Sequence, residues 1–239
     1  MQNIKTIFLK ELRSYFNSPI AYIVMIVYLI ISGFLFVWIG FFQANVASLR
    51  DYFGNFFIQL VLFVIFIPAV TMRSFSEEKK QGTLELLLTK PITDLELIFG
   101  KYLSALALIC ITLSSTILYY IVIVFLGPIP FGPFFTSLIG FILMSAFFIG
   151  IGIFVSSLTE NQIVAFIISV LIALFFFLIG KILMIFPPSI VSFFEYVTTD
   201  YHLNVISRGV IDSRVLLYYF SMIFLTLYLT KVSLESRKW

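Results

Sequence analysis

Residues 163–180 read IVAFIISVLIALFFFLIG, a stretch without a single charged residue. A helix of about 20 apolar residues is long enough to cross the hydrocarbon core of a bilayer. The rest of the chain agrees, because 61% of its 239 residues are hydrophobic and only 11% are charged, which is far from the composition of soluble domains. The sequence therefore predicts an all-α polytopic membrane protein and excludes a soluble domain.

Five further apolar runs of membrane-spanning length accompany this stretch. The six predicted spans cover residues 19–42, 53–72, 95–126, 134–156, 163–186 and 215–234. Polar or proline-bearing breaks separate all of them. We expect residues 1–239 to form a single domain with six transmembrane helices.

The lysines and arginines indicate which way the spans run. Eleven of the 15 share a side with the N-terminus, and four fall on the other side: Arg50, Lys181, Arg208 and Arg214. Basic residues accumulate on the cytoplasmic side of membrane proteins. We therefore expect both termini in the cytoplasm, and we expect the stem of Lys181 to reach the outer interface rather than a buried functional site.

Residues 1–18 have the pattern of an amphipathic helix that lies on the cytoplasmic membrane surface. Apolar residues recur there at helical spacing, and charged residues, Glu11 among them, occupy the opposite side. The residues that we expect at the membrane surface are Lys5, Phe8, Lys10, Leu12 and Arg13. The alternative is a frayed basic tail.

The densest cluster of charge, at residues 73–101, lies between the second and third spans. Ser74 precedes Glu77 by the spacing of a capping box, which predicts the start of a helix. Gly82 is suited to the left-handed conformation that ends a helix, and Pro91 prevents further helical continuation. The pattern favours a structured cytoplasmic segment over residues 73–94, one able to receive a push from a partner protein. The alternative is a solvated loop with incidental charges.

The third predicted span is longer than a bilayer requires. Its 32 residues would extend about 48 Å as a helix, against a core of about 30 Å. Thr93 and Glu96 have capping-box spacing at its start. We expect these first turns to project from the membrane, so that Glu96 and Lys101 lie in water or among headgroups.

The remaining loops carry weaker signals. Residues 157–162 form either a simple turn or a second contact point, with Thr159 placed to cap the next helix. The outer segment, residues 187–214, is expected to form two interfacial or re-entrant helices, with Asp200 capping one of them. His202, the single histidine of the sequence, has no second candidate ligand beside it, which argues against a metal site.

Several classes of function lack the residues that they need. The spans carry no acidic residue or histidine at depth, which disfavours an ion-coupled carrier. The span hydroxyls have no base beside them, so we assign no catalytic residue and no metal ligand. The Gly-Lys pairs at residues 100–101 and 180–181 lack the flanking residues of a phosphate-binding loop. A net charge of +3 does not indicate nucleic-acid binding. The chain itself therefore needs no cofactor, and any nucleotide hydrolysis would belong to a partner.

The charged segment also carries a family resemblance. Residues 73–91, RSFSEEKKQGTLELLLTKP, together with Gly100 and Lys101, resemble the first cytoplasmic signature of ABC-2 type transporter permeases, which have a type V exporter-like fold. Within that family the chain looks like the gliding-motility-associated permease subunits, akin to the permeases of copper and nitrous-oxide systems. Shorter similar stretches are KELRSY at 10–15, ISRGVIDSR at 206–214 and LESRKW at 234–239.

This resemblance implies a permease subunit in the bacterial cytoplasmic (inner) membrane. ATP and magnesium would be bound by a separate cytosolic ABC ATPase, and residues 1–18 would be the elbow helix of the family. A second permease half, either a second copy or a related membrane subunit, would complete the transporter. The residues implied in ATPase coupling are Arg73, Phe75, Glu77, Glu78, Lys79, Lys80, Gly82, Thr83 and Glu85, with Thr159, Glu160 and Asn161 as a minor contact.

Two functions remain open at this point. The family resemblance favours an exporter. The alternative is a non-transporting membrane anchor through which an ABC ATPase mechanically drives or regulates a periplasmic or motility machinery, and a partner subunit with a periplasmic domain would favour it. The spans offer few polar residues for a transport path beyond Gln59, Tyr119 and Tyr120. The sequence does not identify a substrate.

Overall fold

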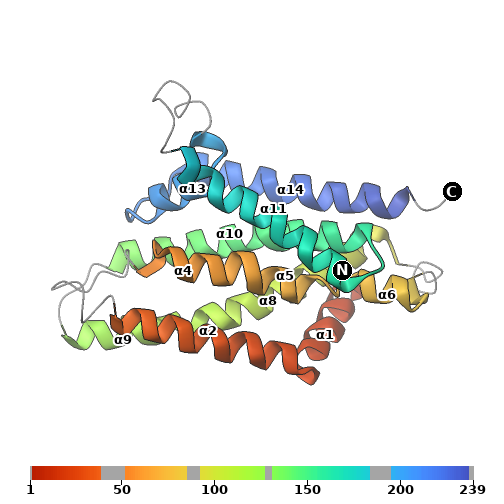
Figure 1. Ribbon diagram of the computed structural model, residues 1–239, viewed down its shortest axis with the longest axis horizontal. Helices are drawn as coiled ribbons and strands as arrows, with labels where there is room; N and C mark the ends of the chain where they lie inside the picture. Colours follow the sequence, from red (N-terminus) through yellow and green to blue (C-terminus); the bar gives the residue numbers. More distant parts are fainter. Residues whose placement is uncertain (1, 39–51, 85–91, 127–130, 184–194, 237–239) are drawn as a thin grey trace.

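The computed structural model describes residues 2–38, 52–84, 92–126, 131–183 and 195–236, and it is a bundle of long helices (Figure 1). The helices of the spans and of the N-terminal segment are α1 (Gln2–Asn17), α2 (Pro19–Val37), α4 (Phe56–Gln59), the π-helix η2 (Leu60–Phe66), α5 (Ile67–Thr71), α6 (Ser76–Lys80), α8 (Asp94–Ser114), α9 (Thr116–Leu126), α10 (Phe131–Leu158), α11 (Gln162–Leu183) and α14 (Ser213–Glu235). The outer segment adds the 3-10 turn η3 (Glu195–Val197) and α13 (Thr199–Ile206).

Six helical stretches are long and apolar enough to cross a membrane, as predicted. They are Pro19–Val37, Phe56–Lys80, Asp94–Phe125, Phe131–Leu158, Gln162–Leu183 and Ser213–Glu235. Successive stretches run in opposite directions, so that α1, α6 and the C-terminal end of α14 lie at one end of the bundle and α13 lies at the other (Figure 1). We call these the inner end and the outer end, after the orientation that the distribution of lysines and arginines predicts.

Helix α10 is the central element of the bundle. It packs against α5, α8, α11, α13 and α14, and 72% of its most apolar window is buried. Two glycines allow this close packing, because a Cβ atom at Gly152 would collide with the side chain of Thr71, and one at Gly150 would collide with Thr226. Small residues at helix crossings serve the same purpose in many membrane proteins.

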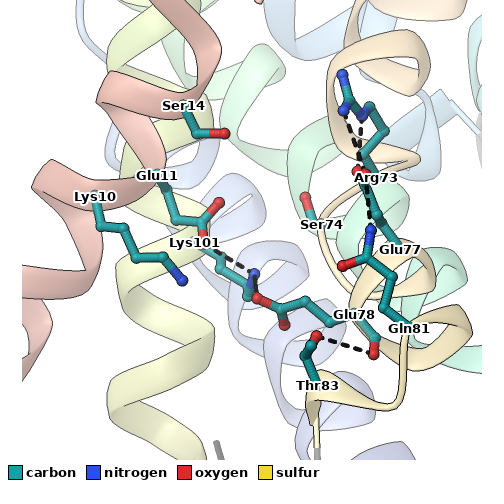
Figure 2. Close-up of a pocket in the computed structure, with 10 residues that line it drawn as sticks. All are labelled: Lys10, Glu11, Ser14, Arg73, Ser74, Glu77, Glu78, Gln81, Thr83 and Lys101. Carbon is teal, nitrogen blue, oxygen red and sulfur yellow. Dashed lines mark hydrogen bonds and ion pairs between the residues drawn. The ribbon is translucent and has the colours of Figure 1, made fainter. Parts of the chain in front are cut away.

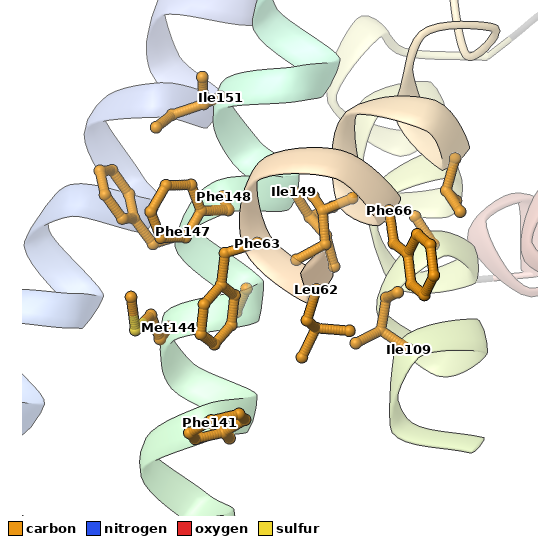
Figure 3. Packing of buried hydrophobic residues seen from close by; sticks show 14 of the residues in the cluster. Leu62, Phe63, Phe66, Ile109, Phe141, Met144, Phe147, Phe148, Ile149 and Ile151 are labelled. Atoms are coloured by element: carbon orange, nitrogen blue, oxygen red, sulfur yellow. The ribbon is translucent and has the colours of Figure 1, made fainter. Parts of the chain in front are cut away.

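The second span packs its bulkiest side chains against α10 at its π-helical part. The ring centroid of Phe63 lies 5.1 Å from that of Phe141 and 5.4 Å from that of Phe148. Leu62 and Phe66 lie nearby, between α10 and α8 (Figure 3). Pro68, which lacks an N–H donor, lies just beyond η2, where the helix returns to α-helical geometry as α5.

The third span begins with the predicted capping box. The Thr93 hydroxyl accepts a hydrogen bond from the Glu96 N–H at 3.3 Å, and the Glu96 carboxylate accepts one from the Thr93 N–H at 3.1 Å. The span is interrupted once, at Ser115, between α8 and α9. Ser115 and its neighbours Ser114 and Thr116 donate their hydroxyl protons to carbonyls one turn earlier, so these groups are satisfied within the helix.

One expectation about the outer end is wrong. Asp200 does not cap a helix, because α13 already starts at Thr199 and the Thr198 hydroxyl accepts the capping bond from the Tyr201 N–H at 3.4 Å. Asp200 instead pairs with Lys181 at 2.8 Å. Lys181 has its Nζ over the rings of Phe56 and Phe177 and is 31% exposed, and its position at the membrane interface stays a prediction. The first of the two predicted outer helices lies outside the described residues.

Candidate functional site

Helix α6, at the inner end, begins differently from the prediction. Ser74 does not cap it, because Ser156 of α10 does so from across the bundle. The Ser156 hydroxyl accepts hydrogen bonds from the N–H groups of Phe75 and Ser76 at 3.0 and 3.1 Å and donates to the Met72 carbonyl at 2.9 Å. The predicted end of this helix is confirmed, since Gly82 has a φ of 66°, in the left-handed region that favours glycine.

A second polar contact and burial fix α6 to the end of α10. The Lys79 ammonium donates to the carbonyl of Ser157, and Phe75 and Ser76 are fully buried. Phe75 therefore cannot touch a partner protein itself, contrary to the role implied for it. Lys80, Gln81 and Gly82 are exposed beyond these anchors, and Arg73, Glu77, Glu78, Lys79 and Thr83 are partly buried. Glu85 lies outside the described residues.

The second predicted contact, residues 159–161, is a short turn between α10 and α11. Glu160 and Asn161 are exposed, and Thr159 is half-buried. Asn161, not Thr159, caps α11, because its side-chain oxygen accepts from the Ile163 N–H at 2.9 Å. Helix α6 packs against both α10 and α11, so the structure brings both predicted contact segments to the inner end.

Lys101 of α8 is the centre of an ion network that the sequence did not predict. Its Nζ lies 2.8 Å from a Glu78 oxygen and 3.1 Å from a Glu11 oxygen, and the lysine side chain is only 3% exposed. The same ammonium lies 5.3 Å from the centroid of the Phe75 ring. The prediction that Lys101 lies in water is wrong, because α1 and α6 both cover the first turns of α8.

Helix α1 packs directly onto α8, and this explains the position of Glu11. Ile7 lies so close to Gly100 that a Cβ atom there would be 2.5 Å from the Ile7 side chain. The Asn3 amide donates to Glu96 at 3.1 Å. Glu11 therefore points toward Lys101 rather than to the polar face where we expected it. Of the predicted surface residues, Lys5, Lys10 and Arg13 are exposed, whereas Phe8 and Leu12 are half-buried.

A polar pocket of about 400 Å³ opens beside this network, between α1, α6 and α8 (Figure 2). Three basic and three acidic side chains are among those that line it: Lys10, Arg73, Lys101, Glu11, Glu77 and Glu78. Arg73 and Glu77 form an ion pair at 2.9 Å and are each about one-third exposed. Ser14 of α1 and Gln81 beyond α6 lie on the rim. The inner end thus joins three helices through charge as well as through the apolar contacts of Ile7 and Phe75.

Elsewhere the polar groups have structural roles. His202 donates its Nε2–H to the Tyr196 carbonyl at 2.9 Å, and its ring stacks on Tyr218 with the centroids 3.9 Å apart. Burial lowers the pKa of His202. Across the described ranges, no group of three histidine, cysteine or acidic side chains could hold a metal ion.

Residues 5–192 match the family described as ABC-2 family transporter protein. The chain belongs to this family. A search of curated proteins found no match. ABC-2 family transporter proteins are multi-pass membrane subunits of ABC transporters, and the ATPase that they work with is a separate cytosolic ABC protein. The matched range includes α1, α6, the pocket and the 159–161 turn, but it ends before α13 and α14.

The sequence could have indicated part of what it missed at this site. Gly100 beside Lys101 marks a close helix approach of the kind seen at other glycines of the bundle. Glu11 is the only acidic residue of the N-terminal helix. What the sequence alone could not supply is the packing of α1 onto α8, which turns these two features into one ion network.

Proposed function

We propose that α6 and the 159–161 turn form the surface through which the ABC ATPase moves this subunit, and that the subunit belongs to an exporter. The observation that carries the proposal is the way α6 is attached. It is anchored to α10 by Ser156 and Ser157, yet Lys80 at its C-terminal end and Gln81 and Gly82 just beyond it are exposed. A protruding segment with a rigid base can pass a displacement to the bundle, whereas a solvated loop would absorb it.

Charge and chain direction support a cytoplasmic location for this surface. The inner end contains α1, α6 and the C-terminal end of α14, and the described residues there, with Arg73 and Lys101 counted, include eight of the 15 lysines and arginines of the chain. The positive-inside rule places such an end in the cytoplasm, where the ATPase is found. The bacterial inner membrane, a second permease half and a gliding-motility-associated system remain part of the proposal, and they rest on the resemblance of residues 73–91.

A second candidate function is mechanical anchoring without transport. The polar side chains considered for a transport path are turned inward. Gln59 is 3% exposed and donates to the Phe53 carbonyl at 2.9 Å. The Tyr119 hydroxyl bonds to Ser32 at 2.9 Å, and the ring of Tyr120 stacks on Phe134 at 4.4 Å. Gln59 is therefore buried away from the outside of the described spans, and Tyr119 and Tyr120, which are half-buried, are engaged within the subunit, which favours either an apolar substrate or a purely mechanical role.

The exposed tip of α6 offers the sharpest test of the docking surface. We expect the double variant Lys80→Glu, Gln81→Glu to retain about tenfold less ATPase during gentle purification, because charges at an interface rim set partner choice. Neither side chain touches the Lys101 network. Lys231→Glu, on a partly exposed residue near the inner end of α14, is the matched control. Full retention of the ATPase by the double variant, or an equal loss in the control, would contradict the proposal.

A further inference from the structure

The inner end contains one buried ammonium group and two carboxylates that compete for it. Lys101 of α8 is shared between Glu78 of α6 and Glu11 of α1. We propose that this network is a latch with two states, in which Lys101 keeps Glu11 when α6 and Glu78 move away. Lys101 and Glu11 would then be positioning residues of the coupling apparatus. This inference rests on the proposed function of α6.

The latch holds two carboxylates at contact distance from one ammonium group. Lys10 and Arg73 also line the pocket, but among the described residues neither forms an ion pair with Glu11 or Glu78. The second oxygen of Glu78 is buried and has no hydrogen-bond donor among the described residues. A buried acceptor without a donor is unfavourable. One oxygen of Glu78 therefore holds α6 to α8 through a strong ion contact with Lys101, while its other oxygen, which lacks a donor, weakens this attachment.

Moving α6 away would relieve the unsatisfied oxygen of Glu78. Glu78 would gain water on both oxygens, and Lys101 with Glu11 would remain as a neutral pair. A buried lysine without any partner is costly. Because Glu11 stays paired with Lys101 when Glu78 leaves, the opening motion does not leave the ammonium group unpaired. The pocket of about 400 Å³ lies between α6 and α1 and gives Glu78 space to leave Lys101, whereas the fully buried Phe75 limits how far α6 itself moves from α8.

The contacts around the latch pair α1 with α8 and α6 with α10. Ile7 against Gly100, and Asn3 against Glu96, hold α1 on α8. Ser156 and Ser157 hold α6 on α10. Helices α8 and α10 also pack against each other, and the Tyr102 hydroxyl donates to the Ala146 carbonyl at 3.2 Å. The ion contact between Lys101 and Glu78 joins α6 itself to α8, so its state governs how directly a push on α6 reaches Lys101 and α1.

A distance measurement across the pocket tests the latch on the full chain in lipid nanodiscs. Spin labels at Ser14→Cys and Gln81→Cys, both exposed on the pocket rim, report the separation of α1 and α6, with Cys110→Ala as background. Glu78→Ala removes the closing contact, so we expect the ratio of long to short distances to rise about tenfold. Glu11→Ala removes the partner that Lys101 needs when open, so we expect the ratio to fall.

The opposite signs distinguish a latch from mere structural support. If both carboxylates only stabilised the fold, both truncations would loosen the pocket, and the two ratios would rise together. That result, or no change in either variant, would overturn the latch. Glu235→Ala, an exposed carboxylate on α14, should leave the distances unchanged.

Adding the ATPase separates this inference from the proposed function. The distances in the subunit alone test the latch without any partner. Failure of the ATPase to bind the tip of α6 would contradict the proposed docking surface, whereas opposite shifts in the two carboxylate variants would still stand. With the ATPase and a non-hydrolysable ATP analogue bound to chains without spin labels, we expect hydrogen exchange in α1 to change in the unsubstituted latch and to change less in Glu11→Ala. An equal change in both would argue against a role for Glu11 in coupling.

Discussion

At each end of the bundle a lysine of a span pairs with carboxylates, but the number of carboxylates and the burial of the lysine differ. Lys181 at the outer end has one partner, Asp200, is 31% exposed, and is covered by the rings of Phe56 and Phe177. Lys101 at the inner end is 3% exposed and has two partners on two other helices. A complete one-to-one pair fixes a helix in place, whereas a lysine with one carboxylate too many can exchange partners.

The largest predicted effect compares the two lysines directly. Lys101→Met keeps the apolar stem but leaves Glu11 and Glu78 buried without a cation, and we expect it to cost about 3–5 kcal/mol of stability. Lys181→Met breaks a partly exposed pair and should cost about 1 kcal/mol or less. Apparent melting temperatures in one detergent provide the ranking. Equal shifts in melting temperature for the two variants would contradict the stronger dependence of stability on Lys101 than on Lys181.

A smaller effect compares the caps at the two ends. Ser156→Ala leaves the N–H groups of Phe75 and Ser76 without their acceptor, and we expect a cost of about 1–3 kcal/mol and faster hydrogen exchange throughout α6. Thr198→Ala removes the cap of α13, with an expected cost of about 1 kcal/mol. Exchange should then accelerate only in α13. If Ser156→Ala leaves exchange in α6 unchanged, the cross-bundle cap is not what holds α6.

The smallest effect is a dependence on pH that should be confined to the outer end. Burial lowers the pKa of His202 from its ordinary value of 6.5. The folded chain therefore binds this proton less readily than the unfolded chain, so the contribution to stability is present above pH 6.5 and is lost as the pH falls from there toward the folded pKa. After correction for the intrinsic slowing of exchange at lower pH, the protection of α13 from hydrogen exchange should fall on acidification in that window, while the protection of α6 should not.

His202→Gln is the control for this last prediction, because glutamine keeps a donor for the Tyr196 carbonyl and does not titrate. The pH dependence of α13 should disappear in this variant. If it persists, another group at the outer end is responsible.

The spans were predictable from the sequence because the bilayer fixes how long an apolar helix must be. Local signals were equally informative where the partners are near in sequence, as in the capping box of Thr93 and Glu96. The left-handed Gly82 belongs to the same class. In each of these cases the interacting atoms lie within a few residues of one another.

The failures share a physical cause, which is a partner far away in the chain. Ser74 has the spacing of a cap, but Ser156 supplies the acceptor from α10. Lys101 was expected in water because helix length alone was considered, and nothing in the spacing shows that α1 folds back over α8. Asp200 was expected as a cap because its ion pair with Lys181 is invisible in the local pattern.

The π-helix in the second span sets the rotational phase of the helical turns that follow it in α5. A π-helical turn takes in an additional residue compared with an α-helix, and one residue corresponds to a rotation of about 100° in α-helical geometry. Beyond η2, this phase turns Thr71 toward Gly152. An uninterrupted α-helix of the same sequence would direct Thr71 elsewhere, so the close approach of the second span to α10 at Gly152 depends on a change of helix type one turn and more before it.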